Sequence, residues 1–463
     1  MVTGFMRSML LATAFVCGLA QSARSIEVPL TYQPFPEEPT EGILPLFGYA
    51  SQTVSTTLPD GNWKLPESVS RPLYCLITLG DMKRLAVLDR QSATDVFFTR
   101  IYFDKNGNGD LTDDPPLDGR LDTNATDDFC FAQFPRVDII VDVNGKPLPY
   151  CIQPSLETPS SKRFSEALRG PRLDPEEIKY LVQLTVYIRC VYVGAFATDK
   201  RTYHVALGDR NGNTRFDDRI AQARPFPSKD RRGSLARGDP QPVYYKGDAL
   251  LVSLSEDFKD SDAFTLGDLL WLEDKLYEVS VDIAGGRMTL TPATAQLMPL
   301  KLAAECDSLS IVSTDLSRCV MMLRPGGKVK VPQGEYRLVA YQVLRKDAQG
   351  DLWRIRARAG QDSPVASVGG HGHPSLVLGE PFTPMVYVPE SSRDKLDRGG
   401  TVADLAFIVC GEGREIVVDL SHVSGTESQI ALSKTRISRP KEAIYRVITP
   451  EGETVAQGTF EYG

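Results

Sequence analysis

Short runs that alternate hydrophobic and polar residues, divided by turn residues, follow one another along the chain from about Leu73. The runs Leu73–Leu79, Arg84–Leu88 and Val96–Phe103 are rich in β-branched and aromatic residues, which suit a pleated, half-buried surface. Short strands with turn signals roughly every 8–12 residues are typical of β-sandwiches. The pattern therefore predicts a mainly β, multi-domain protein of antiparallel sheets or β-sandwiches with short helices.

Turn residues between several runs predict hairpins. Asn144-Gly145 separates Val137–Val143 from Leu148–Ile152, and both turn residues tolerate the positive φ that a two-residue hairpin turn needs. Three further pairs of runs are each joined by Gly-containing turns: Leu276–Val281 with Arg287–Thr291, Glu335–Arg345 with Leu352–Ala357, and Ala443–Ile448 with Val455–Tyr462.

Two stretches have a different pattern. Lys179–Val193 alternates over an unusual length, which predicts one long strand. Proline, serine and charged residues interrupt the alternation between residues 154 and 178, and a short helix is predicted around Ser165–Arg169.

The N-terminus has the pattern of an export signal. Arg7 precedes the apolar run Met9 to Ala20, which small residues follow. This run is too short to span a membrane as a helix, and no other stretch approaches the roughly 18 apolar residues that a span requires. The sequence therefore predicts a secreted protein (extracellular, periplasmic or on the cell surface) without a transmembrane segment.

Charge and cysteine content narrow the possible partners. The formal net charge is −8 at pH 7. This charge argues against nucleic acid as a partner, because affinity for nucleic acid depends on neutralising its phosphates, and it is compatible with divalent cations.

Seven cysteines follow the predicted signal, an odd number, so at least one is unpaired within the chain. Cys306–Cys319 and Cys130–Cys151 are the disulfide candidates; buried free thiols are the alternative.

One loop has the residue spacing of a calcium-binding loop. Calcium takes six to eight oxygen ligands, and a tight loop with Asp or Asn at positions 1, 3 and 5 and Gly at position 6 directs three side-chain oxygens inward. The segment Asp104–Asp114 supplies this order and has a proline where an EF-hand has its closing glutamate. A carboxylate near the end of the segment must therefore complete the shell. The predicted ligands are Asp104, Asn106, Asn108, Asp110, Asp113 and Asp114.

A second loop repeats part of this pattern about 105 residues later, which we interpret as a duplicated module. Thr214 replaces the glycine, and the closing carboxylates come earlier. A third, degenerate copy at Ser255–Asp262 lacks the glycine. In the second loop the predicted ligands are Asp209, Asn211, Asn213, Asp217 and Asp218. The alternative for each loop is a solvated Asn/Gly/Asp turn without an ion, because these residues favour turns for local reasons.

Other candidate chemistry is weaker. His371 and His373 could bind zinc or copper, but a zinc site needs three or four ligands, and an exposed loop is the simpler interpretation. No Gly-x-Ser-x-Gly elbow, Walker loop or dinucleotide fingerprint occurs in the sequence. A pair of acidic catalytic residues would leave no sequence signature, so a hydrolase remains open.

Three resemblances extend this interpretation. The first loop is entered from a strand and is similar to EF-hand and dockerin-like calcium loops. The segment Val329–Arg356, with its Val-Pro-x-Gly-x-Tyr turn, resembles part of a transthyretin-like or carboxypeptidase-regulatory-like β-sandwich. Residues 70–463 together resemble secreted bacterial proteins that combine such loops and modules. The resemblance implies no particular activity.

These observations divide the chain and predict its role. We expect a secreted or cell-surface calcium-binding β-domain protein that is non-enzymatic and binds a protein or glycan partner. The alternative is a secreted hydrolase that acts on glycans or peptides. The calcium ions would be structural. The predicted segments are a signal peptide (1–23), an extended lead-in (24–70), a β module with the first loop (71–165), a β module with the second loop (176–295), a transthyretin-like β-sandwich (296–390) and a C-terminal β-sandwich-like module (400–463).

Overall fold

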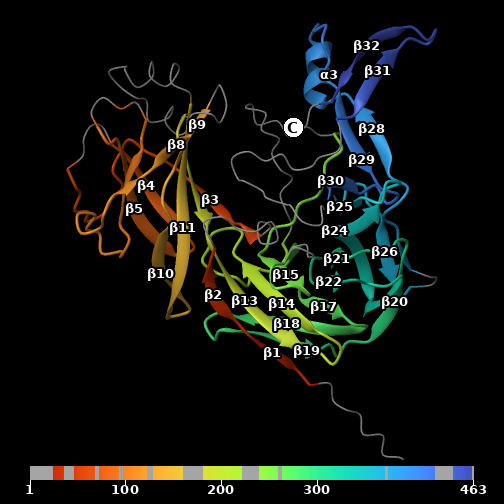
Figure 1. The fold of residues 1–463 in the computed structure, drawn as a ribbon, viewed down its shortest axis with the longest axis horizontal. Helices are drawn as coiled ribbons and strands as arrows, with labels where there is room; N and C mark the ends of the chain where they lie inside the picture. The colour runs from red at the N-terminus through yellow and green to blue at the C-terminus, as the bar shows by residue number, and fades with distance from the viewer. Residues whose placement is uncertain are drawn as a thin grey trace, which may run out of the picture.

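The computed structural model shows a mainly β protein with several antiparallel sheets, as predicted (Figure 1). Within the described residues the one helix is α3 (Glu390–Asp397), and no helix there is long and apolar enough to cross a membrane. The structure describes residues 24–35, 46–67, 72–92, 95, 97–122, 129–159, 181–221, 239–258, 263–370, 374–422 and 442–460.

Three sheets form the N-terminal half. The first has the order β4 (Leu73–Leu79), β5 (Met82–Asp89), β6 (Arg100–Phe103) and β7 (Leu117–Asp118). The second has the order β3 (Tyr49–Gln52), β12 (Gln183–Ile188), β11 (Lys146–Pro159), β9 (Phe129–Gln133) and β8 (Arg120–Asp122), with β10 (Val137–Val143) also paired to β11. The third has the order β16 (Ala263–Thr265), β15 (Ala249–Ser253), β14 (Thr202–Gly208), β13 (Cys190–Ala197) and β2 (Thr31–Pro34).

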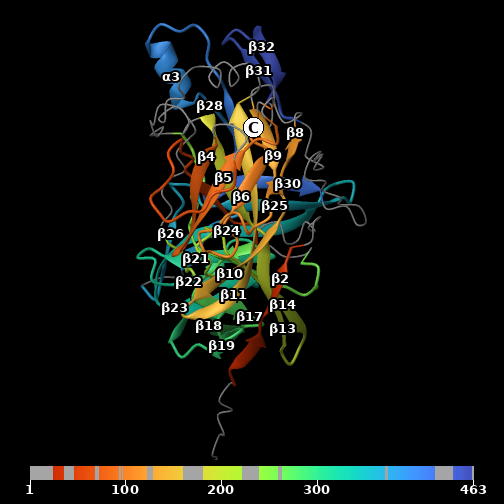
Figure 2. The ribbon, with the colours of Figure 1, turned by 90° about the vertical axis from the view of Figure 1, so that its left-hand side faces the viewer.

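A 12-stranded sheet dominates the rest. Its order is β1 (Ile26–Pro29), β19 (Arg287–Pro292), β18 (Lys275–Asp282), β17 (Leu269–Leu272), β22 (Cys319–Leu323), β21 (Ser308–Ser313), β24 (Gly334–Lys346), β25 (Leu352–Arg358), β30 (Ile416–His422), β29 (Ala406–Cys410) and β28 (Thr383–Tyr387), with β26 (Val365–Val368) paired to β24. Two small sheets contain β23 (Lys328–Pro332), β20 (Leu297–Leu302) and β27 (Ser375–Leu376), and β31 (Ile444–Ile448) and β32 (Thr454–Thr459). The hairpin β31–β32 and α3 lie at one end of the molecule and β1 at the other (Figure 2).

The predicted hairpins are confirmed. β10 pairs with β11 so that Val143 lies opposite Lys146, and the two turn residues have φ of 55° at Asn144 and 81° at Gly145. Alternate residues of β10 are buried, as expected for a sheet with one face in the core. The hairpins β18–β19, β24–β25 and β31–β32 form as well.

The prediction of one long strand over Lys179–Val193 is wrong. The segment contains β12 and β13, which belong to different sheets. At the break, the Arg189 N–H donates to the carbonyl oxygen of Cys151 at 2.8 Å, and the Phe35 N–H donates to the carbonyl oxygen of Arg189 at 2.8 Å. The Arg189 guanidinium also lies 4.8 Å from the ring centre of Phe47. These contacts join segments far apart in sequence, so alternation alone could not reveal the break.

The lead-in is tied into three different sheets. β1 pairs with β19, β2 with β13, and β3 with β12. The predicted modules 71–165 and 176–295 share one continuous hydrophobic core, which also includes Val28 and Met321. The 12-stranded sheet crosses the predicted boundary at residues 295/296, because β17 pairs with β22. The sheets therefore form a more continuous structure than separate modules would.

All seven cysteines of the described residues are free, and six of them are buried. The buried-thiol alternative therefore describes them, and neither candidate disulfide is present among the described residues.

The helix predicted at Ser165–Arg169 lies outside the described residues.

Candidate metal centre

The first loop begins where β6 ends, and its first carboxylate organises it. Asp104 is buried. Its Oδ1 accepts a hydrogen bond from the Gly107 N–H at 2.7 Å, and its Oδ2 accepts one from the Gly109 N–H at 3.3 Å. Both glycines have positive φ, 78° and 80°, so the chain can wrap around the carboxylate at little steric cost. Position 1 thus lies at the centre of the loop, as the predicted ligand order requires.

Side chains at positions 3 and 5 are held in a repeating pattern. The Asn108 N–H donates to Asn106 Oδ1 at 2.9 Å, and the Asp110 N–H donates to Asn108 Oδ1 at 2.7 Å. Both asparagine amides donate to Asp113, from Asn108 Nδ2 to Oδ2 at 2.8 Å and from Asn106 Nδ2 at 3.3 Å. Asp114 Oδ2 accepts from the Lys105 N–H at 2.8 Å. The side chains of Asn106 and Asn108 therefore meet Asp113, while Asp104 and Asp114 each bind backbone amides of the same loop.

The sixth predicted ligand of this loop, Asp110, faces elsewhere. Its carboxylate forms an ion pair with Lys64 Nζ at 2.7 Å, and its Oδ1 accepts from the Thr112 N–H at 2.9 Å. The hydrogen bond from Lys64 holds the Asp110 pKa at about 2, below its usual range. The Asp110 side chain therefore ties the loop to the segment around Lys64 and does not join the other carboxylates.

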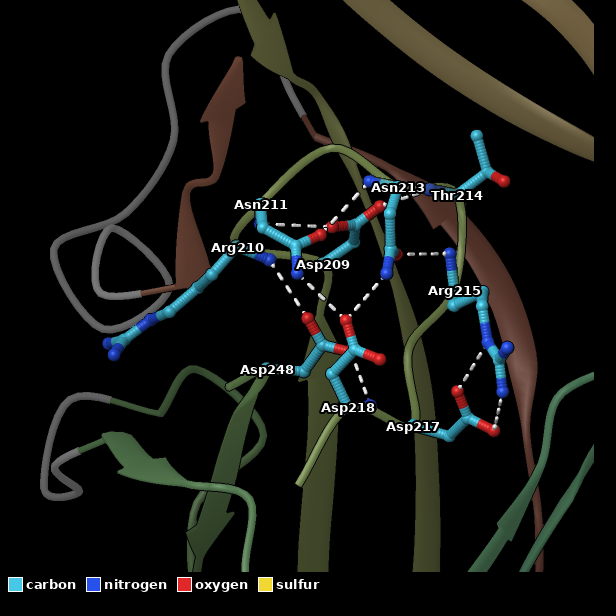
Figure 3. A network of polar contacts seen from close by, with 9 residues as sticks. All are labelled: Asp209, Arg210, Asn211, Asn213, Thr214, Arg215, Asp217, Asp218 and Asp248. Atoms are coloured by element: carbon cyan, nitrogen blue, oxygen red, sulfur yellow. Dashed lines mark hydrogen bonds and ion pairs between the residues drawn. The ribbon is translucent and has the colours of Figure 1, made fainter. Parts of the chain in front are cut away.

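The second loop repeats this architecture where β14 ends (Figure 3). Asp209 is buried, and its Oδ1 accepts from the Gly212 N–H at 2.7 Å. Its Oδ2 accepts from the Thr214 N–H at 2.8 Å and from the Tyr150 hydroxyl at 2.7 Å. Thr214 has a φ of 68°, so it adopts the conformation that Gly109 has in the first loop. The missing glycine has therefore not changed the turn.

The asparagine pattern is also repeated. The Asn213 N–H donates to Asn211 Oδ1 at 3.0 Å. Both amides donate to Asp218 Oδ2, at 2.7 Å from Asn211 and 2.6 Å from Asn213 (Figure 3). Asp218 therefore has the place that Asp113 has in the first loop.

The predicted ligand Asp217 is not part of this group. Its two carboxylate oxygens bind Arg215, to Nε at 3.0 Å and to Nη2 at 3.2 Å. The pair lies on the side of the loop away from Asp209 (Figure 3). The structure therefore places Asp217 in a surface ion pair.

Sequence reasoning missed one member of the second group, Asp248. It lies directly before β15 and is buried. Its Oδ1 accepts from the Arg210 N–H at 3.1 Å and its Oδ2 from the Asp218 N–H at 2.8 Å (Figure 3). The contact with Arg210, at position 2, matches the contact between Asp114 and Lys105 in the first loop. Asp248 thus replaces a carboxylate that the second loop lacks at position 11, where it has Arg219.

Two acidic groups are buried inside the second loop. Burial raises the pKa of Asp248 to about 8, and the neighbouring Asp209 carboxylate adds to the rise. Burial likewise raises the pKa of Asp209 to about 6, although hydrogen bonds from Tyr150 and backbone amides oppose it. The guanidinium of Arg210 points away from these carboxylates (Figure 3). Ionising these buried groups is therefore costly, and a nearby cation would favour their charged forms.

A positive group does lie against the first loop. The Arg84 guanidinium donates to the carbonyl oxygens of Asp104 and Lys105, and to that of Ile140 at 2.9 Å. Burial lowers the Arg84 pKa, while Asp104 and Asp114 oppose the change. The two loops therefore share a hydrogen-bond pattern but differ in their electrostatic surroundings.

The second loop lies where three sheets meet. Tyr150 reaches it from β11, and Asp248 from the start of β15. The turn between β4 and β5 also packs against it, because a Cβ added to Gly80 would lie 2.2 Å from the carbonyl oxygen of Asn213. Movement of this loop would therefore disturb all three sheets.

The donor set of both loops consists of carboxylate and amide oxygens. Among the described residues no three His, Cys, Asp or Glu side chains lie close enough together to hold a metal ion, so the three carboxylates of each loop do not converge on one point in this structure. The third copy lies partly outside the described residues; in the described part, Ser255 Oγ donates to Asp257 Oδ1 at 2.5 Å. His371 and His373 lie outside the described residues.

Comparison with protein-family models, with curated proteins and with solved structures finds no match.

Proposed function

We propose that this chain is an exported β-domain protein that binds a calcium ion in each of the two loops, and that the ions stabilise the junctions between its sheets. The observation that carries the proposal is the repeated arrangement around Asp104 and Asp209, in which two asparagines and two further carboxylates gather at each loop. The N-terminal segment, with its short apolar run after Arg7, supports export.

The residues present fit calcium better than a transition metal. Calcium prefers hard oxygen ligands, whereas zinc and copper prefer imidazole and thiolate. The residues that would hold the ions are Asp104, Asn106, Asn108, Asp113 and Asp114 in the first loop, and Asp209, Asn211, Asn213, Asp218 and Asp248 in the second. A bound calcium ion would compensate the buried carboxylates and stabilise the folded state by mass action.

A structural role fits the position of the second loop better than a catalytic one. Asp209 and Asp248 are fully buried between sheets. Their hydrogen bonds come from Tyr150 and from backbone amides, which hold the loop in place. We propose that the protein acts by binding a protein or glycan partner, without catalysis, on a scaffold that calcium stabilises.

Thermal unfolding tests the calcium proposal. The chain is heated in EGTA and in about 5 mM calcium, above the 10⁻⁴–10⁻³ M dissociation constants common in extracellular modules. We expect a higher melting temperature with calcium, and a smaller rise in Asp104→Ala and in Asp209→Ala. An equal melting temperature in the two buffers would show that both loops are ordinary turns and would overturn the proposal.

A further inference from the structure

A cavity of about 470 Å³ opens beside the second loop, between Arg210, strand β16 and the face of the 12-stranded sheet. Its volume is within the range of sites for small molecules. Three arginines line it: Arg210 from the loop, and Arg356 and Arg358 from β25. Among the described residues that line the cavity, Asp419 of β30 is the one acidic side chain, so these residues carry a net positive charge.

The arginines of β25 are held in place by their neighbours. The Arg358 guanidinium lies over the ring of Tyr244, 4.9 Å from its centre. Arg356 Nε donates to Gln342 Oε1 at 3.2 Å, and its Nη1 lies 3.6 Å from Asp419 Oδ2. Side chains fixed in this way lose little freedom when a ligand binds, which favours affinity.

We propose that this cavity binds a sugar that carries a carboxylate, and that calcium in the second loop strengthens this binding; the second part rests on the function proposed above. Guanidinium groups bind carboxylates in a planar, two-point geometry. Thr265, Ser310 and Asp419 also line the cavity, and side chains of these polar types can bind the hydroxyl groups of a sugar.

Arg210 connects the cavity to the second loop. Its backbone N–H donates to Asp248 Oδ1 at 3.1 Å, while its side chain points away from the loop carboxylates (Figure 3) and lines the cavity. An ion that fixes Asp248 therefore also fixes the backbone that carries the Arg210 guanidinium. Because coupling between two sites is reciprocal, the sugar would also strengthen calcium binding.

Isothermal titration calorimetry on the whole chain tests the ligand class. Glucuronate, glucose and glutamate are each titrated in saturating calcium. We expect glucuronate to bind at one site, glucose to give no measurable binding, and glutamate to bind at least about tenfold more weakly because it lacks the ring hydroxyls. No binding of glucuronate would overturn the proposal. Equal binding of glucose would overturn the role of the arginines, and equal binding of glutamate would overturn the assignment to a sugar.

Two arginine variants test the position of the site. Arg210→Ala removes the guanidinium but keeps the N–H that binds Asp248, so glucuronate affinity should fall about tenfold, as for a lost charge-assisted hydrogen bond, with calcium binding unchanged. Arg215→Ala is the matched control, because Arg215 is in the same loop but pairs with Asp217. An equal loss of glucuronate affinity in Arg210→Ala and Arg215→Ala would overturn the assignment of the glucuronate site to this cavity.

Titration of glucuronate in EGTA tests the coupling. We expect at least about fivefold weaker binding than in calcium, and no calcium dependence in Asp248→Asn. If calcium binds in the second loop but does not change glucuronate affinity, the coupling is wrong and the calcium proposal stands. If no calcium binds but Arg210→Ala still weakens glucuronate binding, the calcium proposal and the coupling fail together while the cavity assignment survives.

Discussion

Two buried carboxyl groups, Asp209 and Asp248, set the electrostatics of the second loop. Asp209 and Asp248 are both fully buried; burial raises the pKa of both carboxyl groups, and the Asp209 carboxylate adds to the rise at Asp248. Burying unpaired charge is costly, so such groups are expected to be protonated, paired or bound to a cation. Substitutions at Asp209 and Asp248 therefore test the proposed calcium ion directly.

Asp248 is the carboxylate that the rest of the chain adds to the second loop. Asp248→Asn removes one negative charge from the second loop but keeps an oxygen to accept the hydrogen bond from Arg210. We expect calcium titration by calorimetry to show one bound ion in place of two. Asp217→Asn is the control: it breaks only an exposed ion pair with Arg215, so two ions should still bind. A stoichiometry of two in Asp248→Asn would contradict the assignment.

The second residue-scale prediction is a pH dependence without calcium. The pKa of Asp248 rises from 3.8 to about 8 on folding and that of Asp209 to about 6, so the folded state holds protons that the unfolded state releases. In EGTA this stabilising contribution is complete below about pH 4 and is lost as the pH rises to about 8. We expect the wild type to lose more stability than Asp248→Asn between pH 5 and pH 8 in urea unfolding. An identical change of unfolding free energy with pH in the wild type and in Asp248→Asn would contradict this prediction.

At the scale of elements, local turn chemistry accounts for the hairpins. The turn between β10 and β11 has two residues with positive φ, and the sequence supplies Asn144 and Gly145 there. The loop after β14 shows the opposite case, since Thr214 accepts a positive φ against its local preference. Its N–H donates to Asp209, which offsets part of the strain.

A glycine substitution tests the hairpin. An added Cβ at Gly145 meets no atom within 4 Å, so Gly145→Ala changes the backbone preference alone. We expect a loss of about 1–2 kcal/mol in the free energy of unfolding, the cost of a left-handed conformation for alanine. Gly326 is an equally open position without positive φ, and Gly326→Ala should change stability by no more than about 0.5 kcal/mol. Equal losses of stability in Gly145→Ala and Gly326→Ala would contradict the explanation by positive φ.

At the scale of the whole molecule, sheets join segments that the sequence pattern separates. β17 pairs in parallel with β22, so residues on either side of the predicted boundary at 295/296 belong to one sheet. Trp271 and Leu276 pack in the same core as Tyr336 and Val343. The two sides of the boundary therefore depend on each other for stability.

Expression of residues 296–463 alone tests this dependence. The fragment lacks β17, which leaves the edge of the buried strand β22 unpaired, and it loses Trp271 from the core. Because an exposed apolar edge promotes association, we expect aggregation on size-exclusion chromatography and no cooperative urea unfolding. The chain from residue 24 to 463 is the control. A monomeric fragment that unfolds cooperatively would show an independent domain.

The sequence by itself determined the fold class, the hairpins and the two loops. Alternation with period two and Asn-Gly or Gly-containing turns are local signals, and they identified β10–β11 and β24–β25 correctly. The spacing of Asp104, Asn106 and Asn108 likewise predicted a group of side chains that does come together. The identity of any ion in that group stays a prediction.

Only the tertiary structure decided which carboxylates meet and where the sheets begin and end. Asp248 is 30 residues beyond Asp218, yet both belong to one group, while Asp217 and Asp110 turn toward arginine and lysine partners. The break at Arg189 depends on contacts with Cys151 and Phe35. The direction of each side chain and the sheet that each strand joins depend on such long-range packing. Periodicity along the chain carries no information about that packing.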